Sequence, residues 1–196
     1  VASRGLGDVY KRQRNNHELH IRRATEHDIP VIWKILKGEI EVMRRAGRDQ
    51  WQYGYPNPDT VTSDIEIGQG WVLLDGTQVV GYCAFITAGD PCYDHIWDGE
   101  WLTDSNSTNS HYTVVHRLGI DHSRTGQGLA TAFLLMLIDE SKRMGRESMR
   151  IDTNFDNLEM LHILPKIGFI RCGMIMVKDG ERNAFEKVFQ PHKNNQ

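Results

Sequence analysis

Hydrophobic and polar positions follow two different periods along the chain, and these periods divide it into helices and strands. Apolar residues recur at helical spacing over residues 29–43, 129–144 and 157–167, with a shorter example at 59–67. Alternating or continuous apolar segments predict strands at residues 19–22, 71–74, 78–86, 112–120, 149–153, 170–177 and 184–189. The pattern therefore predicts the order β-α-α-β-β-β-α-β-α-β-β, a mixed α/β fold with helices flanking a central sheet.

Short local signals support these element boundaries. Thr25 followed three residues later by Asp28 has the residue types of a capped helix start. Asp75-Gly76 and Asp179-Gly180 are typical hairpin turns between predicted strands. The segments 50–58 and 91–110 show no period and are expected to be ordered loops that contain several aromatic residues.

Length and charge narrow the class of protein. A chain of 196 residues with 39% hydrophobic and 25% charged content fits one globular domain. Residues 1–16 hold four basic residues against one acidic residue and contribute +3 to the net charge of −3, so residues 17–196 carry −6. An acidic body argues against a nucleic-acid partner. The longest nearly apolar run, residues 132–138, is too short to cross a membrane, so no membrane association is expected.

The chain ends are assigned separately from the domain. Residues 1–16 resemble the translation of a sequencing adapter, and we expect them to be an extraneous leader. A single domain is predicted for residues 17–190, with a tail at 191–196. If the leader is native, it is expected to be a flexible basic arm, and the functional interpretation is unchanged.

Cysteine usage gives an expectation about the cellular compartment. The three cysteines, Cys83, Cys92 and Cys172, form no C-x-x-C pair, and their number is odd. Neither a disulfide framework nor a zinc site fits this pattern. We therefore expect small core residues, a reducing cytoplasmic location and no metal.

The segment with the clearest chemical meaning runs from His116 to Ala130. Its sequence, His-Arg-Leu-Gly-Ile-Asp-His-Ser-Arg-Thr-Gly-Gln-Gly-Leu-Ala, places a glycine-bearing turn between a strand and a long helix. The first turn of a helix has unpaired N–H groups and the positive end of the helix dipole, so it can hold a pyrophosphate. A structural turn without a ligand remains the alternative. The segment lacks the third glycine of a dinucleotide-binding loop, and it lacks the Lys-Ser/Thr of a P-loop.

Several further blocks make the chain resemble the GNAT acyltransferases, and in particular their small bacterial members. The Gly-x-Gly-Leu-Ala loop is similar to the pyrophosphate loop of that family, and the resemblance covers roughly residues 18–189. The other blocks lie at residues 50–52, 54–56, 116–117, 151–157, 166–169, 172–175, 179–182 and 185–187.

The resemblance implies acetyl-CoA as the co-substrate and assigns its binding residues. Leu118 and Ile120 would offer backbone groups to the pantetheine arm, and Asn157 would face that arm. The pyrophosphate loop would comprise Ser123, Arg124, Thr125, Gly126, Gly128 and Leu129. One departure is that Ser123 stands where the family commonly has Gln or Arg.

Catalytic residues are less well defined by the resemblance. Base candidates are His116 and Glu100, with Asp104 and His111 as further options, and a packed strand histidine is the alternative for His116. The family's usual proton-donating Tyr falls at Leu164. His162 or a water is then left to protonate the CoA thiolate. Pro165 is a second departure, because it removes a backbone donor late in a helix.

Aromatic residues in the two loops are candidates for the acceptor site. Trp51, Tyr55 and Trp101 are expected to bind the substrate, with Tyr53 and Trp97 as additional wall residues. Anchoring of the loops by buried aromatic rings is the alternative.

The function predicted from these features is N-acetyl transfer to a primary amine of a small molecule, amino acid or peptide. The transfer would be direct, through a tetrahedral intermediate, in a monomer or homodimer. A degenerate GNAT domain that binds acyl-CoA as a sensor or interaction module is the second hypothesis. A nucleotide-binding α/β protein that uses the same loop is the third.

Overall fold

The computed structural model describes residues 18–189. The predicted leader at 1–16 and the tail at 191–196 lie outside the described residues. The chain divides into two compact units, which are described separately. The first unit contains the described residues up to Ala84 together with Arg117–Leu137, and the second contains Phe85–His116 and the residues from Ile138 onward. The assignment of a single domain to residues 17–190 stays a prediction.

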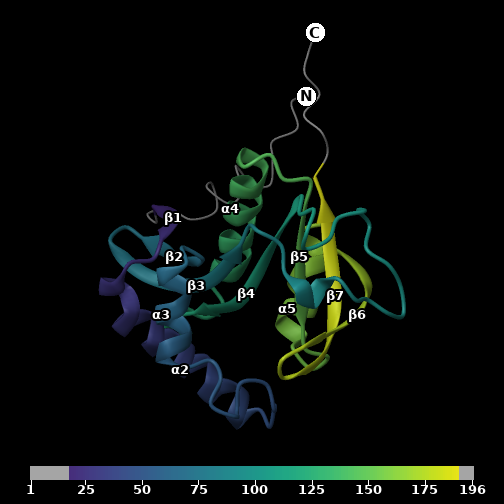
Figure 1. Ribbon diagram of the computed structural model, residues 1–196. Helices are drawn as coiled ribbons and strands as arrows, with labels where there is room; N and C mark the ends of the chain where they lie inside the picture. Colours follow the sequence, from purple (N-terminus) through teal and green to yellow (C-terminus); the bar gives the residue numbers. More distant parts are fainter. Residues whose placement is uncertain (1–17, 190–196) are drawn as a thin grey trace, which may run out of the picture. The chain divides into compact units, whose positions relative to one another are not determined.

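The observed elements follow the predicted order of strands and helices (Figure 1). They are β1 (Leu19–Arg23), η1 (Glu26–Asp28), α2 (Ile29–Arg45), α3 (Pro58–Glu66), β2 (Gly70–Asp75), β3 (Gln78–Ile86), η2 (Pro91–Tyr93), β4 (Tyr112–Ile120), η3 (His122–Arg124), α4 (Leu129–Arg143), β5 (Ser148–Thr153), α5 (Leu158–Lys166), β6 (Ile170–Val177) and β7 (Gly180–Val188). The seven described strands have the order β1-β2-β3-β4-β5-β7-β6 in the sheet. The predicted mixed α/β fold is therefore confirmed.

The first unit is built on antiparallel strands. β1 pairs with β2, and β2 pairs with β3 across the predicted hairpin, in which Gly76 has a φ of 58°. Apolar side chains of α2, α3 and these strands form its core. The buried members of that core are Ala24, Ile32, Ile35, Leu36, Met43, Trp51, Val61, Val72, Leu74, Val79 and Tyr82.

The helix start predicted at Thr25 differs in detail from the observed one. A 3₁₀ turn, η1, precedes the α-helix, which begins at Ile29. The Asp28 carboxylate accepts the Thr25 N–H at 2.7 Å and is held by both terminal nitrogens of Arg22 at 2.7 and 2.9 Å. The capping residues are thus used as predicted, but they close a tighter turn than an α-helix.

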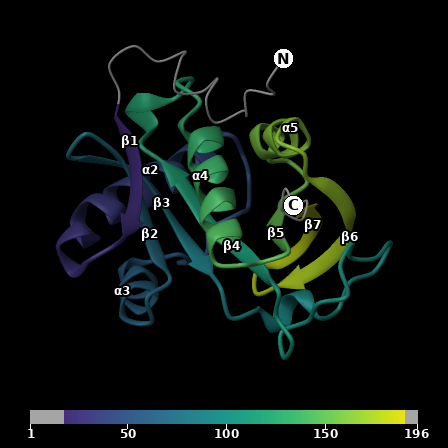
Figure 2. The ribbon, with the colours of Figure 1, turned by 90° about the horizontal axis from the view of Figure 1, so that it is seen from above.

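The second unit combines one parallel pairing with two antiparallel ones. β4 runs parallel to β5 with a register of Tyr112 opposite Ser148 through Val115 opposite Ile151. β7 pairs antiparallel with both β5 and β6. α5 lies on one face of β5, β7 and β6 (Figure 2). The core includes Ile86, Tyr93, Tyr112, Val114, Ile175 and Ala184.

Candidate active site

The glycine-bearing loop after β4 has a tightly defined backbone in the first unit. Asp121 begins it, and its carboxylate accepts the N–H of Ser123 at 3.0 Å and the hydroxyl of Ser123 at 2.8 Å. Gly126 and Gly128 both have positive φ angles, 79° and 67°. Only glycine adopts these angles without strain, so the loop needs both glycines for its shape. α4 then begins at Leu129.

The same loop presents an open backbone surface. Gly126 is exposed, and a Cβ built on it would meet no atom within 4 Å. The first N–H groups of α4 have no acceptor within the helix, because helix geometry provides none. Ser123 and Thr125 are also exposed, whereas Leu129 is buried in the interior. An anion could therefore reach the backbone of this loop without displacing a side chain.

Arg124 is held by a neighbouring hairpin. Its guanidinium forms an ion pair with Asp75 at 2.6 Å and donates to the Gln127 amide oxygen at 2.9 Å. The side chain is only 17% exposed. The pairing fixes the loop against the β2–β3 turn and neutralises much of the charge that Arg124 would offer to a phosphate.

The end of β4 carries the residues expected to meet the pantetheine arm. Leu118 and Ile120 are both partly buried. The Ile120 N–H donates to the Glu39 carboxylate at 3.3 Å, so this backbone group is already engaged. Arg117, immediately before Leu118, has a φ of 54°, which is a left-handed conformation uncommon for a residue other than glycine.

His116 lies between two carboxylates in the second unit. Its Nε2 is 2.7 Å from Asp90 Oδ2, and its Nδ1 is 3.4 Å from Asp152 Oδ1. The ring also stacks on Tyr93, with 5.8 Å between centroids, and the Tyr93 hydroxyl donates to Asp152 at 2.5 Å. Both ring nitrogens therefore face acceptors, which favours the doubly protonated imidazolium.

The electrostatics of this cluster follow from that geometry. Burial lowers the pKa of His116, but the hydrogen bonds and negative charges of Asp152 and Asp90 outweigh it and raise the pKa to about 9. Burial raises the pKa of both carboxyls, yet the hydrogen bond and charge of His116 leave each pKa below its ordinary value. The cluster is therefore charged at neutral pH, with one cation between two anions.

The other catalytic candidates lie on exposed segments. Glu100, Asp104 and His111 are exposed in or just after the loop that precedes β4, and His111 also contacts the Asn109 side chain at 3.1 Å. His162 is exposed on α5. None of these residues has a described contact that would set it apart as an acid or base, and their roles stay predictions.

Three further positions that the sequence singled out have structural roles at α5. Asn157 is the N-cap of this helix, and its side-chain oxygen accepts the Met160 N–H at 3.2 Å. Leu164, at the position of the expected tyrosine, is fully buried. Pro165 lies in the last turn, and the helix ends one residue later at Lys166.

The loop aromatics differ widely in accessibility. Trp51 is 9% exposed and belongs to the core of the first unit, whereas Tyr53 is 84% exposed. The Tyr55 hydroxyl accepts a hydrogen bond from Arg117 at 2.6 Å. Trp97 pairs with Met174 through two backbone hydrogen bonds. Of these four rings, Tyr53 offers the most surface to a ligand.

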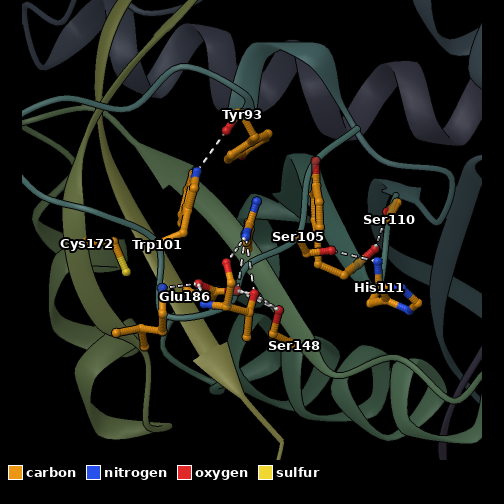
Figure 3. A network of polar contacts seen from close by, with 12 residues as sticks. Tyr93, Trp101, Ser105, Ser110, His111, Ser148, Cys172 and Glu186 are labelled. Carbon is orange, nitrogen blue, oxygen red and sulfur yellow. Dashed lines mark hydrogen bonds and ion pairs between the residues drawn. The ribbon is translucent and has the colours of Figure 1, made fainter. Parts of the chain in front are cut away.

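A buried polar network anchors the loop that contains Trp101 (Figure 3). Glu186 on β7 accepts the N–H groups of Leu102 at 2.6 Å and Thr103 at 3.2 Å. Its carboxylate also accepts the hydroxyls of Thr103 and Ser148, and it pairs with Arg150 at 3.1 Å. Glu186 and Arg150 are both fully buried.

Aromatic rings enclose the cation of this network. The Arg150 guanidinium lies 4.3 Å from the centroid of Trp101 and 4.1 Å from that of Tyr112. The Trp101 indole N–H donates to the Tyr93 carbonyl at 2.8 Å (Figure 3). One face of the Trp101 ring therefore packs against the Arg150 guanidinium, which leaves only the rest of the ring for contact with a substrate.

Sequence reasoning missed the partners of His116. Asp152 could have been found, because His116 and Asp152 directly follow Val115 and Ile151, the last pair in the parallel register of β4 and β5. Asp90 and Tyr93 come from an irregular segment after β3, and no period in the sequence places them beside His116.

A metal-binding cluster and a membrane-spanning helix are both absent from residues 18–189. This part of the chain contains no group of three or more His, Cys, Asp and Glu side chains placed to hold a metal ion. It also contains no helix with the length and apolar character that crossing a bilayer requires. Cys83, Cys92 and Cys172 are free thiols.

Comparison with known proteins identifies the family. The model of the acetyltransferase (GNAT) family matches residues 40–169. A GNAT family acetyltransferase from Streptococcus agalactiae 2603 shares 33% identity with a TM-score of 0.80, over 88% of this chain and 96% of its own. One from Listeria monocytogenes 4b F2365 shares 15% identity with a TM-score of 0.68, over 87% and 95%. The yncA protein of Salmonella typhimurium, solved with its cofactor acetyl-CoA, shares 19% identity with a TM-score of 0.61, over 91% and 97%.

The search of curated proteins gave no match. The family model alone spans well over half of the sequence, and the Streptococcus agalactiae protein is related over nearly its full length. The chain belongs to the GNAT acetyltransferase family.

Proposed function

We propose that this protein is an N-acetyltransferase that moves an acetyl group from acetyl-CoA to a primary amine of a small molecule, amino acid or peptide. The observation that carries this proposal is the loop between β4 and α4, in which Gly126 and Gly128 set the backbone shape and Gly126 leaves open space just before a helix N-terminus. Membership of the GNAT family supports it. The acetyl-CoA bound to the Salmonella typhimurium relative is consistent with the same donor.

The loop would bind the pyrophosphate of CoA through its main chain. Donors would come from Arg124 to Leu129, where the positive end of the α4 dipole adds to the attraction. Because Arg124 is already paired with Asp75, we assign its side chain to holding the loop. Leu118 and Ile120 would pair with the amides of the pantetheine arm, and the Ile120 N–H would then exchange Glu39 for a ligand carbonyl.

The proposed reaction is direct acyl transfer. The neutral amine attacks the thioester carbonyl, a C–N bond forms, and the carbonyl oxygen becomes an oxyanion that needs a hydrogen-bond donor. Collapse of this intermediate breaks the C–S bond and releases the CoA thiolate, which takes up a proton, while the amine nitrogen loses one. We assign the oxyanion donor to a backbone N–H near Leu118. Holding the two reactants together would supply much of the rate.

His116 is proposed as the base, and its surroundings give that role a testable pH dependence. With a pKa of about 9, His116 is a cation at neutral pH and accepts a proton only after losing its own. The kcat/KM is then expected to rise with pH up to about 9. Replacement by Gln should remove this limb of the profile. An unchanged profile in His116→Gln would assign the limb to another group, with Glu100 the next candidate.

The proton donor to the thiolate is assigned to His162 or to water. A simple thiol has a pKa near ~8.5, so the leaving thiolate needs at most a weak acid. The buried Leu164 provides no such group, and this observation favours the second candidate function, an acyl-CoA-binding module without turnover. Measuring CoA release with a panel of amines separates an enzyme from a binding module.

The first experiment measures acetyl-CoA binding by calorimetry in the wild type and in Gly126→Glu. The added carboxylate would repel pyrophosphate and block the open backbone. Gly47→Glu is the matched control, because Gly47 also has a positive φ, 70°, and open space around it. We expect binding in the wild type and the control and a loss of at least about tenfold in Gly126→Glu.

Two results would count against the proposal. If the wild type does not bind acetyl-CoA at millimolar concentration, acetyl-CoA is not the acetyl donor. Equal loss in Gly126→Glu and Gly47→Glu would show that strain, and not the ligand site, causes the effect. A cytoplasmic location and a monomer or homodimer remain part of the proposal, the former supported by the three free thiols.

A further inference from the structure

Arg117 is the strained residue of β4. Its φ of 54° is left-handed, and such a conformation is unfavourable for a residue with a Cβ relative to the ordinary regions. It lies within a strand, between His116 and Leu118, where regular geometry would be expected. A strained backbone persists only when surrounding contacts fix it, so the contacts of Arg117 identify what holds β4 in this shape.

Those contacts use all three guanidinium nitrogens. Nε donates to Asp64 Oδ2 at 3.0 Å, and one terminal nitrogen donates to Asp64 Oδ1 at 2.5 Å. The other terminal nitrogen donates to the Tyr55 hydroxyl at 2.6 Å. The paired geometry is a bidentate arginine–carboxylate contact, which fixes direction as well as distance. We call Arg117, Asp64 and Tyr55 the β4 clamp.

The β4 clamp is itself fixed and shielded. Asp64 lies on α3 with a side chain 6% exposed, and it also accepts the Tyr82 hydroxyl at 2.6 Å. The Arg117 side chain is 13% exposed. Burial lowers the pKa of Arg117, but the charge and hydrogen bond of Asp64, together with Tyr55 and Tyr82, outweigh burial and raise the pKa above its ordinary value. The guanidinium therefore stays charged at every pH at which the protein is folded.

The backbone that follows Arg117 has little freedom to adjust. A Cβ added to Gly119 would lie 3.2 Å from Leu36 of α2, so β4 runs close against this helix. The register with β5 covers Tyr112 to Val115 and ends before the strained residue. A change at Arg117 would therefore be transmitted to the backbone around Leu118, where the proposed oxyanion donor lies.

We propose that Asp64 and Tyr55 are positioning residues, which act through Arg117 to aim the backbone N–H near Leu118 at the thioester. This inference rests on the proposed acetyl transfer. It gives Tyr55 a role different from the predicted aromatic wall, because its hydroxyl serves the backbone of β4. It also explains why a large charged residue occupies a left-handed position that glycine would fill without strain.

The test uses variants that separate contact from strain. Asp64→Asn keeps the shape of the side chain and removes its charge. Arg117→Ala removes the β4 clamp and keeps the cost of the left-handed conformation, whereas Arg117→Gly removes both the β4 clamp and that cost. Asp28→Asn is the matched control, because Asp28 forms a bidentate pair with Arg22 in the same unit and its described hydrogen bonds go to Arg22 and Thr25. If Asp64→Asn fails to fold, Tyr55→Phe removes one contact without leaving an unpaired charge.

The kinetic readout is kcat, calculated for the fraction of molecules that can bind acetyl-CoA. That fraction is measured from the stoichiometry of acetyl-CoA binding. Arg117→Ala and Asp64→Asn are expected to lower kcat by about ten- to a hundredfold, with the KM for acetyl-CoA changed less than about threefold. Arg117→Gly should retain about five- to thirtyfold more kcat than Arg117→Ala, since it avoids the strain. Equal kcat in Arg117→Gly and Arg117→Ala would overturn the inference.

A second readout does not depend on activity. Amide hydrogen exchange of residues 112–120 in the unliganded protein should become faster in Asp64→Asn by more than its loss of global stability explains, whereas in Asp28→Asn any change should match the loss of global stability. Unchanged exchange in Asp64→Asn would overturn the β4 clamp whatever the kinetics show. Failure of the wild type to bind acetyl-CoA would instead reject the proposed function, so the two failures are distinguishable.

Discussion

Replacing Glu186 by Gln removes the central acceptor charge of the network in Figure 3 while keeping nearly the same volume. The change leaves the Arg150 guanidinium fully buried between two aromatic rings without its only carboxylate partner among residues 18–189. The change also places an NH2 group where a Glu186 oxygen accepted hydrogen bonds, because the side-chain amide of glutamine has a single acceptor oxygen. The protein should lose stability through an uncompensated buried charge.

The size of the loss follows from burial. Both partners of the ion pair are 0% exposed, and breaking a buried pair by removing one charge costs about 3 to 5 kcal/mol. For a chain of this size, about 1 kcal/mol lowers the Tm by roughly 2 to 4 °C, so Glu186→Gln is expected to lower it by roughly 6 to 20 °C. The double variant Glu186→Leu, Arg150→Met removes both charges and should lose less than Glu186→Gln, since no buried charge is left unpaired.

The assay is equilibrium urea unfolding of Arg150→Met, Glu186→Leu and the double variant, combined as a double-mutant cycle. A coupling energy of at least about 2 kcal/mol is expected. A coupling energy near zero, or a Glu186→Gln variant as stable as the wild type, would refute the conclusion that the buried pair fixes the loop of Trp101. Arg143→Met, at an exposed pair with Glu140, serves as control and should change stability little.

Three further predictions concern stability. His116 has a pKa of about 9 in the folded protein against 6.5 in the unfolded chain, so its charge contributes about 3 kcal/mol to stability below pH 6.5, and this contribution is lost as the pH rises through 9. Urea unfolding at a series of pH values should show this pH-dependent loss in the wild type and not in His116→Gln. The pKa of Asp28 is lowered to about 2, chiefly by the hydrogen bond from Arg22. Asp28→Asn should therefore lower the free energy of unfolding by about 1 to 2 kcal/mol at neutral pH and by almost nothing below pH 2. Equal losses of stability at both pH values would argue against the ion pair. Gly99→Ala should cost about 2 to 4 kcal/mol by thermal denaturation, because its Cβ would lie 1.9 Å from the Cys172 carbonyl oxygen at a φ of 147°, and a variant with wild-type Tm would contradict this close approach.

The sequence predicted the fold well because its strands and helices carry strong periods. The segments 29–43 and 129–144 became α2 and α4 with boundaries shifted by at most two residues, and the Asp75-Gly76 hairpin formed as expected. The helix start at Thr25 was less accurate, since residue types that cap an α-helix also close a 3₁₀ turn. Local signals therefore specified the elements and their order, while the exact geometry of their ends depended on packing.

The candidate site was predictable only in part, for a related reason. The loop at 121–128 is continuous in sequence, so its glycines and helix N-terminus can be recognised without knowing any tertiary contact. The partners of His116 and Arg117 come from residues 23 to 62 positions away, and their contacts exist only after the chain has folded. The sequence gives no sign of the left-handed φ of Arg117, because glycine is the residue type that indicates such a conformation.

His116 and Arg117 are adjacent in the chain, but their charges respond to pH in different ways, and this difference separates their roles. Arg117 keeps its charge throughout the folded range, so the β4 clamp contributes no limb to a pH–rate profile. A limb near pH 9 must then come from His116 or from another titrating group, and an amine acceptor with a pKa near ~10.4 is the obvious competitor. Comparing acceptors of different basicity distinguishes the two. A limb that belongs to the amine moves with the pKa of the acceptor, whereas one that belongs to His116 stays near 9 and disappears in His116→Gln.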